Sequence, residues 1–137
     1  MEDDIILIDK PADISSFGVV AKVRGYLKHE YGHKVKVGHT GTLDPFATGL
    51  LILLTGKMTK KSNDFLKKDK VYEATLKLGY TSTTGDPEGE ISEYPGTEAG
   101  ATPKLTDIEF HLQNFLGTIR QTPPRFSAIK INGQRAY

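Results

Sequence analysis

A five-residue apolar run, Leu50 to Leu54, places the tightest constraint on how this 137-residue chain folds. A loop rich in glycine and threonine precedes the run, and Thr55-Gly56 ends it. A short apolar segment between turn residues is typical of a strand buried in a core. It is far shorter than the roughly 20 residues that a membrane-spanning helix needs. The sequence therefore predicts a globular domain built around a sheet, without a membrane segment.

Hydrophobic periodicity predicts alternating strands and helices along the rest of the chain. The clearest pattern lies at 70–79, where Tyr72 and Leu76 face away from Glu73 and Lys77, as in a half-buried strand. The predicted strands are 5–8, 34–37, 50–54, 70–79, 117–121 and 126–131, and the predicted helices are 17–30, 57–68 and 107–115. This order predicts an α+β fold with a mixed, largely antiparallel sheet flanked by helices.

Local signals define several boundaries of these elements. Ser15 or Ser16 is expected to cap the first helix, and Gly32 to end it. Thr106 is expected to cap the last helix, with Glu109 in the capping-box position. In the predicted helix at 57–68, the side chains expected to face the core are Met58, Phe65 and Leu66. Residues 80–104 are acidic and rich in turn residues, which predicts a surface excursion, and Asn132-Gly133 is a turn signal.

The charge is unevenly distributed, although the formal net charge is only +1. Residues 20–83 carry 12 Lys or Arg and 5 Asp or Glu, whereas residues 84–109 carry 1 and 7. A separate basic region attracts polyanions such as nucleic acid, although a lysine-rich solvated face gives the same count. The chain has no cysteine and starts without the basic region of a signal peptide, so we expect a cytoplasmic protein.

Asp44 stands out in the loop GHTGTLDPFATG, where glycines and threonines surround a single carboxylate. Pro45 restrains the preceding residue towards an extended conformation, which fixes the direction of the Asp44 side chain. Taken alone, an Asp-Pro in a loop is better explained as a turn residue than as a nucleophile. The four histidines show no metal-ligand spacing, and neither a phosphate-binding loop nor a nucleophile elbow is present.

Four ordered segments of the sequence settle this choice. GHTGTLDPFATGLL closely resembles the active-site motif of the TruB-type pseudouridine synthases, which modify position 55 in the T-loop of tRNA. The segment IDKPADISSFGVVAKVR resembles that family's N-terminal motif, and PPRFSAIKINGQRAY resembles a later one. The segment GKMTKKSNDFLKKDKVYEATLKLGYTSTTGDPEGEI is similar to the block between them.

The resemblance implies that Asp44 is the nucleophile that turns uridine into its C-glycoside isomer. In this family the N1–C1′ bond breaks, and the freed base rotates and rejoins through C5, without a metal or organic cofactor. The resemblance leaves open whether the carboxylate adds to C1′, adds to C6 or helps to form a glycal. The target base has to leave the RNA stack before a carboxylate can reach it.

Other matched positions are expected to bind the substrate. Tyr72 matches a tyrosine that stacks on the target base and is implicated in removing the C5 proton. His39 matches a histidine beside the flipped nucleotide. Basic motif positions that support the RNA or the active-site loop are matched by Lys10, Lys60 and Lys130. Asp86 is expected to hold the turn around Gly85 and Gly89.

The resemblance implies that these 137 residues correspond to the N-terminal part of a catalytic domain, so we expect them to lack its remainder and any C-terminal RNA-binding domain. A piece of a longer protein and a natural truncation both agree with this expectation. The family's arginine that pairs with the catalytic aspartate belongs to a Lys-Gly-x-Tyr-x-Arg motif that this sequence does not contain. The expected partner is tRNA, with a monomeric state and no obligate protein partner. Two alternatives are a non-catalytic RNA-binding or RNA-folding module, and a guide-dependent synthase that acts on other RNA.

Overall fold

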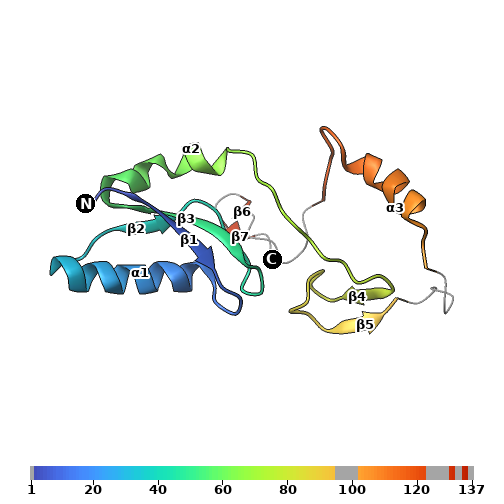
Figure 1. Ribbon diagram of the computed structural model, residues 1–137, viewed down its shortest axis with the longest axis horizontal. Helices are drawn as coiled ribbons and strands as arrows, with labels where there is room; N and C mark the ends of the chain where they lie inside the picture. Colours follow the sequence, from blue (N-terminus) through green and yellow to red (C-terminus); the bar gives the residue numbers. More distant parts are fainter. Residues whose placement is uncertain (1, 95–101, 123–129, 132–133, 136–137) are drawn as a thin grey trace. The chain divides into compact units, whose positions relative to one another are not determined.

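A computed structural model describes residues 2–94, 102–122, 130–131 and 134–135, and the chain divides into two compact units (Figure 1). Unit 1 covers Met1–Glu73 and unit 2 covers Ala74–Tyr137. All strand pairings in the described residues are antiparallel. The α+β class is therefore confirmed, although the strands form three small sheets rather than one large sheet.

The sheet of unit 1 has the order β1-β3-β2, formed by Ile5–Lys10, Gly49–Thr55 and Val37–His39. The apolar run that constrains the fold is the central strand β3, as predicted. Ile6 lies opposite Leu53 and Ile8 opposite Leu51, so that these side chains share one face of the sheet. Strand β2 begins three residues later than the predicted strand at 34–37, because Val37 is the first residue to pair with β3.

Helix α1, Ser16–Tyr31, covers this face of the sheet (Figure 1). Ser15 is its N-cap, and the Ser15 hydroxyl accepts a hydrogen bond from the Gly18 N–H. Gly32 ends the helix with a left-handed φ of 73°, as the glycine signal predicts. The buried core between helix and sheet consists of Val19, Val20, Leu27, Val35, Val37, Leu51 and Leu53. Full burial of each such side chain contributes roughly 1.5–3 kcal/mol, so this core holds unit 1 together.

The predicted helix at 57–68 is present in two parts, a 3-10 segment η1, Gly56–Lys61, and α2, Ser62–Leu66. Met58 and Phe65 are partly buried, but Leu66 is 47% exposed, so its predicted core position is wrong. A five-residue helix makes less than one and a half turns, which limits how many of its side chains can face the sheet.

The strand predicted at 70–79 does not form. Residues 69–77 have no regular secondary structure, and Val71, Tyr72 and Leu76 are each at least 70% exposed. Alternation makes a segment able to be a strand, but a strand needs a neighbour for its N–H and C=O groups. Within the described residues no strand forms a ladder with 70–79, apart from one bond of the Tyr94 N–H to the Gly79 carbonyl, and this is the physical reason why the prediction is wrong.

Unit 2 contains a hairpin of β4, Tyr80–Ser82, and β5, Ile91–Glu93, within the predicted surface excursion. Asp86 holds the connecting turn as expected. Its carboxylate accepts hydrogen bonds from the Thr84 hydroxyl at 2.7 Å and from the Glu88 N–H at 3.0 Å. Gly85 adopts a left-handed φ of 80°, which glycine permits at little cost.

Helix α3, Leu105–Leu112, continues into the 3-10 segment η2, Gln113–Phe115. Lys104 is its N-cap, so the prediction of Thr106 is wrong by two residues. The Asp107 carboxylate, and not Glu109, accepts a bond from the N-cap N–H at 3.3 Å.

The strand predicted at 117–121 does not form. Of the strand predicted at 126–131, only Lys130–Ile131 (β6) is described, and it pairs with Gln134–Arg135 (β7). The predicted Asn132-Gly133 turn lies outside the described residues. No helix in the described part of the chain is long and apolar enough to cross a membrane.

Two glycines of unit 1 provide a test of this architecture. A Cβ at Gly25, an exposed residue of α1, would meet no atom within 4 Å, so Gly25→Ala should stabilise the protein by about 0.5–1 kcal/mol. A Cβ at Gly56, where φ is 53°, would collide with the Asp3 carboxylate and lie 2.7 Å from the Glu2 carbonyl oxygen. Gly56→Ala should therefore destabilise by at least about 1–2 kcal/mol. Urea denaturation measures both changes, and equal effects of the two substitutions would contradict the fold described here.

Candidate active site

Lys10 ends β1 and lies directly opposite Gly49 of β3. The two-residue period of the strand places it on the same face as Ile6 and Ile8, so its side chain enters the core. Lys10 is fully buried, with 0% of its surface exposed. A buried ammonium group is tolerated only when hydrogen bonds replace its lost hydration.

Three backbone carbonyls provide this compensation. The Lys10 ammonium donates to the carbonyl oxygens of Ile14 at 2.7 Å, Pro11 at 2.9 Å and Pro45 at 3.0 Å. An ammonium has three donors, so all of its hydrogen-bonding capacity is used. The first two acceptors belong to the turn after β1, whereas Pro45 belongs to the loop that contains Asp44. Lys10 therefore joins two loops that are 35 residues apart in sequence.

Two further contacts join the same loops. The Ser16 hydroxyl donates to the Leu43 carbonyl at 2.9 Å and accepts from the Leu43 N–H at 2.9 Å. The Asp13 N–H donates to the Pro45 carbonyl at 2.9 Å. Asp13 adopts a left-handed φ of 63°, a conformation that aspartate tolerates better than most residues. We call these contacts of Lys10, Asp13 and Ser16 with Leu43 and Pro45 the loop clamp.

The loop clamp holds the backbone on both sides of Asp44. Leu43 and Pro45 are each fixed, while Asp44 between them is exposed and its carbonyl accepts a turn bond from the Ala47 N–H at 3.1 Å. No ion pair or hydrogen bond engages the Asp44 carboxylate within the described residues. The arrangement is a free carboxylate on a restrained loop, and such a group keeps its direction when a substrate binds.

His39 ends β2, five residues before Asp44. The residue is partly buried, and its Nδ1 is shielded from solvent without a hydrogen-bond partner among the described residues. A shielded ring nitrogen without a partner is unfavourable by about 1–3 kcal/mol. Unpaired polar atoms of this kind are uncommon in folded proteins, so the Nδ1 of His39 needs a physical reason for its position.

The structure brings together only some of the predicted site residues. Lys10 reaches the loop of Asp44 through the carbonyl of the neighbouring Pro45, and no hydrogen bond joins it to Asp44 itself within the described residues. Lys60 is exposed in η1, beyond Thr55 and so past the end of β3 that lies away from Lys10. Tyr72 is 70% exposed on the irregular segment, and within the described residues no hydrogen bond joins it to Asp44. Lys130 lies in β6 opposite Arg135, in the other unit.

The sequence motifs did not indicate a part in the site for Ser16 or Asp13. The pair Ser15-Ser16 was the sequence signal that could have identified Ser16. One hydroxyl, that of Ser15, is enough to cap the helix, which leaves the Ser16 hydroxyl for another partner. Lys10 was expected to support either the RNA or the active-site loop, and its buried contacts favour the loop. As for metals, no three His, Asp or Glu side chains converge as ligands in the described part of the chain.

Comparison with known proteins agrees with the motifs. Residues 28–137 match a family model described as TruB family pseudouridylate synthase (N terminal domain). A relative from Phocaeicola vulgatus named tRNA pseudouridine synthase B is 47% identical, over 99% of this chain and 57% of the relative. Relatives of the same name from Clostridium kluyveri and Ectopseudomonas mendocina are 44% and 46% identical, over 98% of this chain and 44% and 41% of the relatives.

The fold, the clamped aspartate loop and these matches define a domain of the pseudouridine synthase class. The chain belongs to the TruB family of pseudouridylate synthases. It spans about half the length of the curated relatives it matches.

The loop clamp can be tested by removing its central donor. Lys10→Met should destabilise the protein by on the order of 1–3 kcal/mol, because three carbonyls lose a charged donor and two of them have no replacement in the clamp. The control Lys22→Met removes an exposed lysine of α1 and should change stability by less than about 0.5 kcal/mol. Urea denaturation of both variants decides the matter, and a Lys10→Met protein as stable as the control would refute the clamp.

Proposed function

We propose that the protein containing this chain isomerises uridine to pseudouridine at position 55, in the T-loop of tRNA, with Asp44 as nucleophile. The observation that carries the proposal is the exposed Asp44 carboxylate on a loop whose two neighbouring residues are held by Lys10, Asp13 and Ser16. The names of the relatives support tRNA as the substrate class. Family membership supports the reaction type.

The reaction requires a carboxylate that is both accessible and oriented. The N1–C1′ bond of uridine breaks, the base turns, a C5–C1′ bond forms, the C5 proton leaves and N1 takes up a proton, so that the product is an isomer. Uridine within a folded RNA loop is inaccessible, so the enzyme flips the nucleotide out of its stack. Effective catalysis then depends on holding the reacting groups in place, which is the physical use of a loop restrained on both sides of the nucleophile.

Tyr72 and His39 are proposed as contacts of the flipped nucleotide. The exposed ring of Tyr72 is available to stack on a base, and such stacking contributes about 1–3 kcal/mol per base. His39 ends β2 five residues before Asp44, and its motif position supports a contact with the flipped nucleotide. Lys60 and Lys130 are proposed to contact phosphates of the RNA, as their motif positions imply.

Asp44→Asn tests the catalytic role. The amide keeps the size of the side chain but removes the negative charge, so pseudouridine formation should fall by at least about 10³-fold while tRNA affinity stays within a few fold. Full-length wild-type and variant proteins should be incubated with a tRNA transcript, without guide RNA, and the product nucleosides analysed.

The matched control is Asp86→Asn, which changes another aspartate whose role lies in the hairpin turn of unit 2. This control should retain the wild-type chemical step. Normal turnover by Asp44→Asn would refute the nucleophile. Wild-type protein that binds tRNA without forming pseudouridine indicates a non-catalytic RNA-binding module, and a requirement for guide RNA indicates a guide-dependent synthase.

A further inference from the structure

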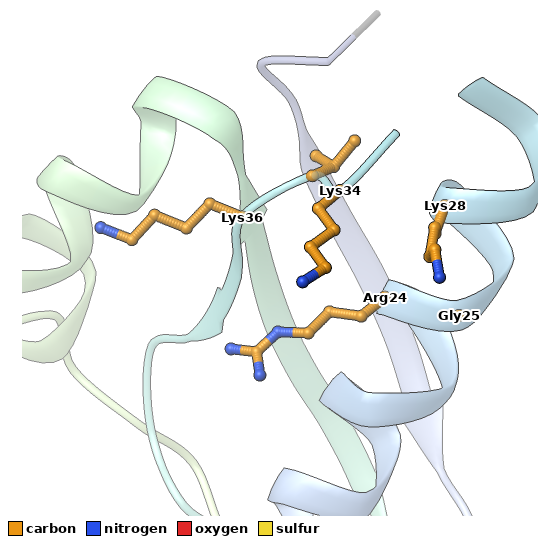
Figure 2. A pocket seen from close by; sticks show the side chains of 6 residues that line it. Arg24, Gly25, Lys28, Lys34 and Lys36 are labelled. Carbon is orange, nitrogen blue, oxygen red and sulfur yellow. The ribbon is translucent and has the colours of Figure 1, made fainter. Parts of the chain in front are cut away.

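A cavity of about 500 Å³ lies between the second half of α1 and the segment that leads into β2. Figure 2 shows Arg24 and Lys28 projecting from the helix and Lys34 and Lys36 from the facing segment. We call this cavity, with its lining residues, the basic groove: Arg24, Gly25, Lys28, Lys34, Val35 and Lys36.

The charges of the basic groove are uncompensated. Four of its six lining residues are cationic, and none is acidic. The ion pairs within the described residues join His33 to Glu2 and Lys57 to Asp3, and neither includes a cation of the groove. Like charges gathered without counter-charges repel one another, and a bound anion removes that repulsion.

One of these cations is held in place by the fold. The Arg24 Nη2 donates to the Val37 carbonyl at 2.6 Å, and its guanidinium lies 5.7 Å from the centre of the Phe17 ring. Val35 is 8% exposed and anchors the facing segment in the core, while its neighbours Lys34 and Lys36 are exposed. Two elements therefore present cations around one cavity from a fixed backbone.

The positive surface continues on the other side of the same segment. A second cavity, of about 370 Å³, shares Lys34 and Lys36 with the basic groove and adds Lys57 and Lys60 from η1. Glu2 and Asp3 also line this cavity and partly compensate it, whereas the basic groove has no such acids.

The basic groove is remote from Asp44 within unit 1. Ser16, at the start of α1, holds the Asp44 loop, and a helix rises 1.5 Å per residue. Arg24 and Lys28 therefore lie about 12 and 18 Å further along the helix axis. An RNA that places one nucleotide at Asp44 has further phosphates at distances of this order.

We propose that the basic groove binds the phosphodiester backbone of the RNA away from the modified nucleotide. The inference rests on the proposed function for its substrate. Phosphate contacts require cations but no apolar anchor, and they position an RNA without reading its sequence. A protein partner is disfavoured because Val35, the one large apolar residue in the lining, is buried, whereas protein interfaces have an apolar core.

The test compares two triple variants of the full-length protein, each lacking three exposed lysines. Lys28→Gln/Lys34→Gln/Lys36→Gln removes groove lysines and leaves Arg24 in its structural contact. Lys22→Gln/Lys67→Gln/Lys68→Gln removes the same charge from positions that do not line the groove. Both sets are made in the Asp44→Asn background, so that no product forms, and thermal melts confirm that each variant is folded.

The measured quantity is the affinity for a tRNA transcript as a function of salt concentration. Each lost phosphate contact lowers the slope of log K against log salt by about 0.7–0.9. The groove variant should lose about 2 units of slope and bind at least about tenfold more weakly at low salt. The control variant should keep the parental slope within about half a unit. Equal slopes for the two variants would overturn the proposal.

Two further measurements distinguish binding of the RNA backbone from a small-anion site and from failure of the proposed function. Inorganic phosphate, added at constant ionic strength, should weaken tRNA binding by the parental protein and by the groove variant equally. If phosphate weakens tRNA binding by the parental protein alone, the groove is a small-anion site and the assignment to RNA backbone is overturned. Pseudouridine formation by protein with Asp44 intact is assayed separately. Absence of product contradicts the proposed function, while the slopes still decide the groove.

Discussion

The buried ammonium of Lys10 is the interaction on which the candidate site depends. A strand alternation that serves the core at Ile6 and Ile8 also carries Lys10 inward, where only the carbonyls of Pro11, Ile14 and Pro45 replace water. Removing the ammonium deprives the turn after β1 and the Asp44 loop of their common donor. Lys10 is the last residue of β1 and also fixes the Asp44 loop before β3. Folding of the small sheet and positioning of the Asp44 carboxylate therefore depend on the same residue.

The clamp explains how an exposed carboxylate can still be a precise one. Surface loops ordinarily gain accessibility at the expense of order, because few contacts restrain them. In this loop the restraining hydrogen bonds are made by backbone groups of Leu43 and Pro45. The Asp44 side chain takes no part in them and stays exposed. The proposed contacts with RNA phosphates lie at the far end of α1, so the same helix that begins at the clamp also separates the two proposed RNA contacts.

Local signals predicted β1, α1 and β3 of unit 1 well, because each of these elements is decided by its own residues and near neighbours. Ser15 caps α1, Gly32 ends it, and Leu50 to Leu54 form the central strand. The segment 70–79 shows where such reasoning stops: its alternation is clear, yet pairing depends on a partner strand that the pattern cannot supply. Local patterns had the same limit at the candidate site. The motif identified Asp44, whereas the roles of Asp13 and Ser16 depend on contacts between residues about 30 positions apart in sequence.

Amide hydrogen exchange of the full-length protein tests the clamp most directly. The Leu43 and Asp13 N–H groups donate within the clamp, so both should exchange at least about tenfold more slowly than free loop amides, and Lys10→Met should lower the protection of Asp13. The Thr40 N–H, which donates to the Ile52 carbonyl at 3.0 Å, should remain protected in both proteins. If Leu43 and Asp13 in the wild-type protein exchange as fast as amides of an unfolded peptide, the Asp44 loop is not held and the account is wrong.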